Sequence, residues 1–135
     1  MGAKLKQVVL IDDSVADNFL HRMVIEDTGL VEEIVEFQYA EKALEYLRDR
    51  EPPPVDLIFL DINMPRMNGF EFLEEYAKLP EERQARMVVT MLTTSLNPED
   101  EERARRCGTV KGYLTKPLME EAFVALVQER FGVGV

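Results

Sequence analysis

Short apolar runs alternate along this chain with longer segments whose apolar residues recur at helical spacing. The clearest runs are Val8–Ile11, Val55–Leu60 and Met87–Leu92, and each of them ends at a polar residue. Strands that alternate with helices form parallel sheets, and parallel strands are rich in apolar residues because helices cover both of their faces. The alternation therefore predicts an α/β chain of five strands and five helices.

The residues that flank these runs indicate where the elements begin and end. The first strand stops at Asp12 and Asp13, and Ser14 or Asp17 can cap a helix that carries apolar residues as far as Gly29. We expect the later strands at 34–39, 55–60, 87–92 and around 113–114. We expect the later helices before the proline run at 52–54, at 70–79, at 98–108 and across 119–127.

Composition restricts the class of protein. A chain of 135 residues suits a single domain, and its 46% hydrophobic content is enough for a core. The formal net charge of -10 argues against a surface that binds nucleic acid or an anionic membrane. Cys107 is the only cysteine, so the chain forms no internal disulfide. Because neither a signal peptide nor an apolar run of spanning length is visible, we expect a cytoplasmic protein.

Polar side chains follow four of the expected strands. Asp12 and Asp13 follow the first, Asp61 the third, Thr93 the fourth and Lys116 the fifth. The carboxyl ends of parallel strands lie at one edge of a sheet, where ligands bind. Three carboxylates at that edge repel one another, so either their pKa values rise or a cation joins them. An all-oxygen cluster suits a hard ion, and we expect Mg²⁺, with Mn²⁺ as the alternative.

The same residue types suit phosphoryl transfer. A carboxylate such as Asp61 can act as the nucleophile toward a phosphoryl group and form an aspartyl phosphate. A cation, a lysine ammonium such as Lys116 and a hydroxyl such as Thr93 can then hold the three equatorial oxygens. The strand ends therefore predict a site that accepts a phosphoryl group on Asp61.

Five segments resemble, in order, the signature of response-regulator receiver domains: Val8–Asp13, Leu60–Pro65, Met67–Gly69, Leu92–Thr93 and Tyr113–Pro117. The resemblance implies a flavodoxin-like, doubly wound sheet of five parallel strands in the order 2-1-3-4-5. It also implies a single receiver domain over residues 1–135, with its core at about 6–131 and no output domain. Within the family, the chain is similar to receivers paired with phytochrome-like or hybrid histidine kinases.

The resemblance also assigns roles to individual residues. Asp61 would be the phosphoacceptor, and the metal would be bound by Asp12, Asp13, Asp61 and the backbone carbonyl of Asn63. Lys116 would contact the phosphoryl group, Thr93 and Tyr113 would form the conformational switch, and Pro117 would follow a cis peptide bond. Asn63 and Ser95 match positions that tune dephosphorylation in the family.

The expected partners are a sensor histidine kinase or a histidine phosphotransfer protein, together with a target protein that binds the face formed by residues 98–131. Activation can also produce a dimer. The alternative is a small Mg²⁺-dependent phosphatase with an aspartyl-phosphate intermediate. That class uses a second carboxylate two residues after its nucleophile, where this chain has Asn63. A receiver-like chain that only binds partners is disfavoured because every core position is filled.

Two further residues, His21 and Cys107, have side chains that can take part in chemical reactions. His21 is the only histidine and lies within the first helix, so a surface or packing role is favoured over a phosphoryl relay. Cys107 precedes Gly108 at a helix end, where a small buried hydrophobe is the expected role. We assign neither of them a function.

Overall fold

The computed structural model describes residues 4–49, 55–92, 98–106, 108 and 110–132. Within them, five strands form one parallel sheet in the order β2-β1-β3-β4-β5. The strands are β1 (Leu5–Ile11), β2 (Val31–Phe37), β3 (Leu57–Asp61), β4 (Met87–Leu92) and β5 (Val110–Thr115). The α-helices are α1 (Val15–Thr28), α2 (Ala40–Asp49), α3 (Gly69–Tyr76), α4 (Pro98–Arg106) and α5 (Glu120–Phe131). The predicted α/β class and strand order are confirmed.

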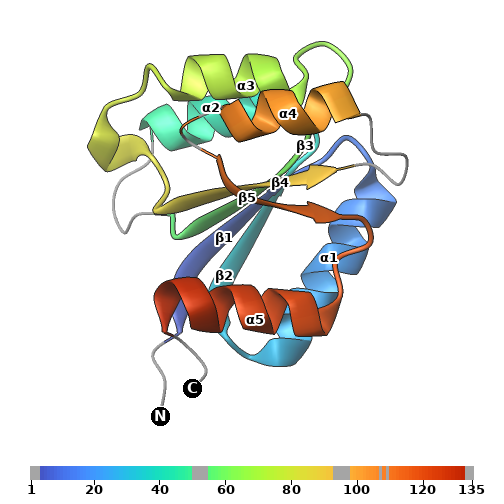
Figure 1. Cartoon of the computed structure of the whole chain (residues 1–135). Coiled ribbons are helices and arrows are strands. Elements are labelled where there is room, and N and C mark those ends of the chain that lie inside the picture. The colour runs from blue at the N-terminus through green and yellow to red at the C-terminus, as the bar shows by residue number, and fades with distance from the viewer. Residues whose placement is uncertain (1–3, 50–54, 93–97, 107, 109, 133–135) are drawn as a thin grey trace.

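Helices cover both faces of this sheet (Figure 1). The helices α2, α3 and α4 lie on one face, and α1 and α5 lie on the other. The chain runs from β1 to the edge strand β2, returns to β3 on the far side of β1, and then continues outward to β4 and β5. Strand order therefore reverses between β1 and β3, and in such sheets this reversal opens a crevice at the carboxyl ends of the strands.

Some element boundaries differ from the predicted ones. The strand β2 begins at Val31, three residues earlier than expected, because its pairing with β1 begins where Leu5 faces Val31. Asp61 is the last residue of β3 and pairs with Met91 of β4. The short 3-10 helix η1 (Glu81–Arg83) was not predicted, because three polar residues carry no apolar period.

The core consists of two apolar clusters, one on each face of the sheet. Successive side chains of a strand point to opposite faces, so β1 supplies Val9 and Ile11 to the cluster under α2 and α3, and Val8 and Leu10 to the other. Phe123 of α5 is fully buried in this second cluster. Burying a side chain of this size contributes about 1.5–3 kcal/mol. The sheet that carries the site is therefore held rigidly from both sides.

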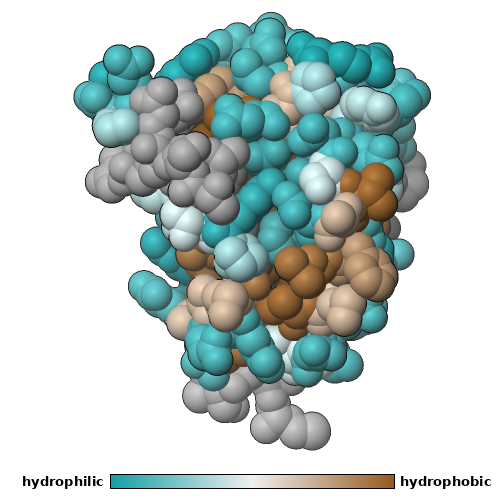
Figure 2. All heavy atoms as spheres, turned by 90° about the vertical axis from the view of Figure 1, so that its right-hand side faces the viewer, coloured by the Kyte–Doolittle hydropathy of each residue, from teal (hydrophilic) through white to brown (hydrophobic). Residues whose placement is uncertain are grey.

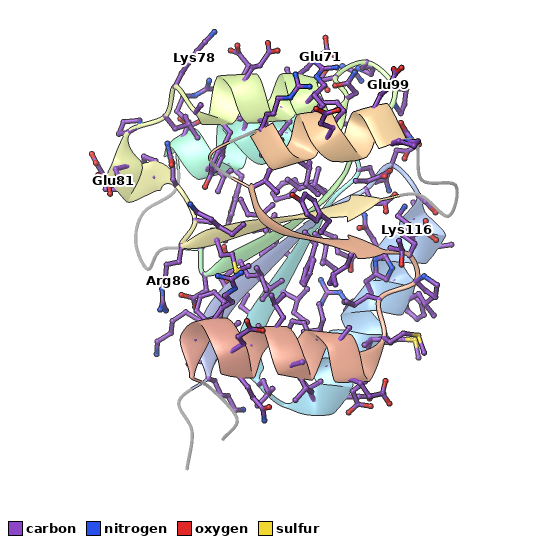
Figure 3. The ribbon with its side chains drawn as sticks, in the orientation of Figure 1. Glu71, Lys78, Glu81, Arg86, Glu99 and Lys116 are labelled. Atoms are coloured by element: carbon purple, nitrogen blue, oxygen red, sulfur yellow. The ribbon has the colours of Figure 1, made fainter. Side chains whose placement is uncertain are left out.

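The amino ends of the strands are joined through a buried carboxylate. Asp56, which precedes β3, is only 4% exposed and accepts a hydrogen bond from the backbone N–H of Lys6 at 2.6 Å. Its other oxygen accepts from Arg86 Nη1 at 3.0 Å. Arg86 and Lys116 lie at opposite ends of the sheet in Figure 3. The amino ends of β1, β3 and β4 are thus joined by one carboxylate with both oxygens occupied.

Candidate functional site

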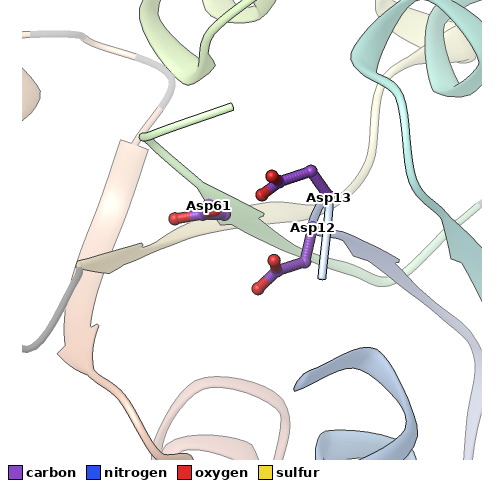
Figure 4. Close-up of side chains that lie close together, drawn as sticks. All are labelled: Asp12, Asp13 and Asp61. Atoms are coloured by element: carbon purple, nitrogen blue, oxygen red, sulfur yellow. The ribbon is translucent and has the colours of Figure 1, made fainter. Parts of the chain in front are cut away.

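Three carboxylates meet at the carboxyl ends of β1 and β3. Asp12 and Asp13 follow β1 directly, and Asp61 ends β3. The register pairs Ile11 with Leu60, so the residues that come next lie side by side. One oxygen from each of the three carboxylates lies within 4.8 Å of the others. Figure 4 shows the three side chains grouped around one point, as the sequence predicted.

Burial differs among the three acidic residues. Asp12 and Asp61 are 3% and 2% exposed, whereas Asp13 is exposed. Two carboxylates therefore lie in a region of low dielectric, where charge repulsion is strong, and the third opens the cluster to solvent. A cluster with this geometry can receive a small cation from solution without a rearrangement of the core.

The loop after β1 is fixed by its own side chains. The backbone N–H of Ser14 donates to Asp12 Oδ1 at 3.0 Å, and Ser14 caps α1 by accepting from the N–H of Asp17. Asn18 Nδ2 donates to the backbone carbonyls of Asp12 at 2.9 Å and Phe37 at 3.3 Å. The start of α1 therefore holds the carboxyl ends of β1 and β2 in place, and Asp12 with them.

The loop after β3 approaches the following helix closely. The N–H of Gly69 donates to the carbonyl of Ile62 at 2.8 Å, and α3 begins with a capping box between Asn68 and Glu71. A Cβ at Gly69 would lie 2.7 Å from Ile62 Cα and 2.8 Å from the carbonyl oxygen of Asp61. Position 69 therefore requires glycine so that α3 can pack against the backbone of Asp61.

Lys116 brings a cation into the cluster from β5. Its Nζ lies 2.6 Å from Asp12 Oδ2, 3.0 Å from Asp17 Oδ2 and 3.7 Å from Asp61 Oδ2. The Lys116–Pro117 peptide bond is cis. The ammonium therefore makes closer contacts with Asp12 and with Asp17 of α1 than with Asp61.

The pKa values show where negative charge is poorly compensated. Burial, followed by the charge of Asp12, raises the pKa of Asp61 to about 7, although Lys116 and the N–H of Asn63 oppose the rise. Burial works to lower the pKa of Lys116, but its hydrogen bonds to Asp12 and Asp17 outweigh burial and raise that pKa above its ordinary value. Asp61 is thus the carboxylate that lacks a sufficient counter-charge.

The remaining predicted residues are placed as follows. Asn63 is exposed, and its N–H lies 3.4 Å from Asp61 Oδ1. Tyr113 is partly buried and packs against the apolar cluster under α2 and α3. Thr93, Ser95 and Cys107 lie outside the described residues.

Sequence reasoning missed two features of α1. His21 is 3% exposed, and burial, the largest influence, lowers its pKa; Asp12 and Lys116 act on it as well. The sequence placed His21 within the first helix and away from the strand ends, whereas in the structure it lies near enough to Asp12 and Lys116 for their charges to affect it. Asp17, considered only as a helix cap, contacts Lys116. No local signal links two residues that stand 99 positions apart.

The sequence matches the response regulator receiver domain family over residues 8–128. The chain belongs to this family. A response regulator receiver protein from Dyadobacter fermentans has a similar structure, with a TM-score of 0.82 and 30% identity over 92% of this chain and 96% of that one. The bacteriophytochrome response regulator RtBRR has a TM-score of 0.75 and 28% identity over 97% of this chain and 79% of its own.

Among curated relatives, the sensor histidine kinase GacS of Pseudomonas protegens is 27% identical over 135 residues, which span all of this chain and 14% of the kinase. Family membership makes the chain a signalling domain of two-component systems and not a classical enzyme. Receiver domains partner with histidine kinases. The acidic triad is typical of the receiver metal site. In the part of the chain that the structure describes, no helix has the length and apolar character needed to cross a membrane.

Proposed function

We propose that Asp61 accepts a phosphoryl group from the phosphohistidine of a histidine kinase or histidine phosphotransfer protein, with Mg²⁺ bound by Asp12, Asp13 and Asp61. The grouping of these three carboxylates within 4.8 Å, with Lys116 in contact with Asp12 and near Asp61, is the observation that carries the proposal. Carboxylate oxygens are the ligands that Mg²⁺ prefers, and the raised pKa of Asp61 indicates negative charge that a divalent cation would offset. The residues therefore fit the ion.

The proposed transfer forms a bond between an oxygen of Asp61 and phosphorus, and it breaks the bond between phosphorus and the donor's histidine nitrogen. The histidine leaves with the electron pair of that bond. Only ionised Asp61 is a nucleophile, so the reaction needs the proton removed from this carboxyl. Bound Mg²⁺ supplies charge that favours the ionised carboxylate and neutralises phosphoryl oxygens. Lys116 donates to one phosphoryl oxygen, which its 3.7 Å distance from Asp61 allows after a small movement.

Family roles extend this proposal to further residues. The backbone carbonyl of Asn63 would complete the metal site, where Mn²⁺ could replace Mg²⁺. Thr93 and Tyr113 would couple the phosphoryl group to the face at 98–131, and Asn63 and Ser95 would tune dephosphorylation. The partial burial of Tyr113 against the apolar cluster supports a ring whose packing can change with the site.

The surface beside the site supports a protein donor. Five large apolar side chains on α1 and at the start of α5 are 46–58% exposed: Val15, Phe19, Leu20, Met23 and Met119. Figure 2 shows apolar side chains gathered on this face of the molecule. A donor histidine must reach bonding distance of Asp61, so its protein covers the loops from which α1 and α5 begin. We therefore place the donor's docking site on this surface.

The phosphatase alternative has less support. The residue two positions after Asp61 is the exposed amide Asn63, which cannot exchange a proton as a general acid and base. Family membership also favours a signalling domain.

The proposal is tested by incubating the protein with acetyl phosphate, with Mg²⁺ or with a chelator, and measuring intact mass. The expected result is one added phosphoryl group in the presence of Mg²⁺, mapped to Asp61 by borohydride reduction and peptide sequencing. Phosphorylation at another residue, or an equal yield with the chelator, would contradict it.

The docking surface is tested with Phe19→Ser, which should slow transfer from a cognate kinase and leave the acetyl phosphate rate unchanged.

A further inference from the structure

Lys116 is held by two carboxylates, of which only one belongs to the acidic triad. Its Nζ lies 3.0 Å from Asp17 Oδ2 and 2.6 Å from Asp12 Oδ2. Asp17 lies in the first turn of α1 and is not among the residues whose oxygens cluster within 4.8 Å. The Lys116 side chain is 13% exposed and the Asp17 side chain 39% exposed, so this contact is only partly screened by water.

We propose that Asp17 is a positioning residue that restrains Lys116 away from Asp61 and so slows phosphorylation. The proposal rests on the function proposed above, in which Lys116 must donate to a phosphoryl oxygen on Asp61. A cation bound to Asp12 competes with Lys116 for that carboxylate, whereas Asp17 keeps its hold on the ammonium. Lys116 then exchanges its contact with Asp17 for one with the phosphoryl group.

Asp17 could also serve only to stabilise the start of α1, and the direction of its side chain distinguishes that role from the proposed one. An acidic residue in the first turn favours a helix through the dipole, and the backbone N–H of Asp17 is the group that Ser14 caps. Neither effect needs its side chain to point at Lys116. The Asp17 side chain nevertheless points toward the end of β5, where it accepts a hydrogen bond from the ammonium of Lys116. A purely helical role would leave the position of Lys116 unchanged by substitution.

The first test compares Asp17→Asn with wild type in acetyl phosphate at saturating Mg²⁺ and fixed ionic strength. We expect the initial rate of Asp61 phosphorylation to rise about two- to fivefold, the size typical of releasing a partly exposed ion pair. Asp27→Asn removes an exposed carboxylate from the other end of α1 and should leave the rate unchanged. A rate in Asp17→Asn that equals or falls below wild type would overturn the proposal.

The second test asks whether Asp17 acts through Lys116. In a Lys116→Ala background, Asp17→Asn should have no effect on the rate, because the restrained group is absent. An equal acceleration there would show general repulsion of the anionic donor and overturn the positioning role.

An NMR measurement keeps the inference distinct from the proposed function. The side-chain ammonium signal of Lys116, recorded without metal or donor, should shift in Asp17→Asn and not in Asp27→Asn. An unshifted signal would overturn the ion pair. If wild-type protein accepts no phosphoryl group at Asp61, the proposed function is wrong, and so is the proposed effect of Asp17 on phosphorylation. The NMR shift would still report the ion pair between Asp17 and Lys116 in that case.

Discussion

The sheet carries a buried carboxylate at each end, and the two have very different surroundings. Asp56 at the amino end is 4% exposed, and each of its oxygens receives a short hydrogen bond, one from a backbone N–H and one from Arg86. Asp61 at the carboxyl end is 2% exposed, but its contacts with Asn63 and Lys116 are 3.4 and 3.7 Å long. Asp12 and Asp13 add negative charge beside it.

The comparison shows that burial alone does not make a carboxylate reactive. A buried carboxylate with full hydrogen bonding contributes to the structure, because its desolvation is offset. A buried carboxylate with only long contacts to its partners keeps negative charge that is poorly compensated, and a bound cation can offset that charge. We therefore expect Asp61 and Asp56 to differ both in reactivity and in what they contribute to stability.

Phosphorylation should distinguish the two carboxylates completely. Asp61→Asn removes the nucleophile, so the acetyl phosphate adduct seen by intact mass should fall by at least about a hundredfold. Asp56→Asn should keep the full yield for each folded molecule, because residue 56 lies at the far end of the sheet. Loss of the adduct in a folded Asp56 variant would break the contrast.

The pH dependence of stability should reveal the stored charge at Asp61. An unfolded aspartate ionises near pH 4, whereas Asp61 in the metal-free folded protein ionises near pH 7. Its contribution to stability is therefore lost as pH rises from about 4 to 7 and stays constant above that. Between about pH 4 and pH 7, the free energy of unfolding of Asp61→Asn should therefore increase relative to that of wild type by about 2–4 kcal/mol.

Urea unfolding followed by circular dichroism at pH 4.5 and pH 8 measures this gain, and it suits a chain that lacks tryptophan. Added Mg²⁺ should shrink the gain, since a cation favours the ionised carboxylate. Stability curves of variant and wild type that remain parallel with pH would show that the charge of Asp61 is compensated in the free protein.

Removing the carboxylate at the amino end should cost stability. Asp56→Ala leaves the N–H of Lys6 without its partner, and we expect a loss of about 2 kcal/mol in urea unfolding. Arg86→Ala should cost less, because Asp56 keeps its bond to the backbone and the arginine side chain is 56% exposed. An arginine variant that loses as much as Asp56→Ala would place the stabilisation in the ion pair.

The smallest effect concerns the loop that positions Asp61. Gly69→Ala places a methyl group against Ile62 Cα and the carbonyl oxygen of Asp61. The backbone must shift, and we expect a loss of about 1–2 kcal/mol together with slower phosphorylation at Asp61. Gly108→Ala is the matched control, because a Cβ at Gly108 meets nothing within 4 Å. A similar loss of activity in both variants would remove the steric explanation.

The residues that could be predicted from sequence share one property, which is that their positions follow from strand ends. Asp12, Asp13, Asp61 and Lys116 each stand at the last residue of a strand or within two residues after it, and parallel pairing brings such positions together. The order of the strands was predicted separately, from the resemblance to the receiver family, and it is confirmed. The side of a helix that faces the sheet, in contrast, does not follow from where the strands end.

The helix α1 shows why the rest could not be predicted. It has apolar residues on more than one side, and the buried side consists of Asn18, His21 and Ile25. Hydrogen bonds from Asn18 to the ends of β1 and β2 fix this rotation and leave Phe19 and Met23 exposed. The contact of Asp17 with Lys116 depends on the same rotation. The rotation of α1 and the contact of Asp17 could not be predicted, because the spacing of the apolar residues is compatible with more than one buried side of the helix.

The origin of the cluster in β1 and β3 has a consequence for synthesis on the ribosome. All three carboxylates belong to the first half of the chain, and Lys116 is added roughly 50 residues later. At about 5–20 residues per second, this is an interval of several seconds. The growing chain thus acquires its three acidic residues before the lysine that pairs with Asp12, and until residue 116 is added that ammonium cannot offset their charge.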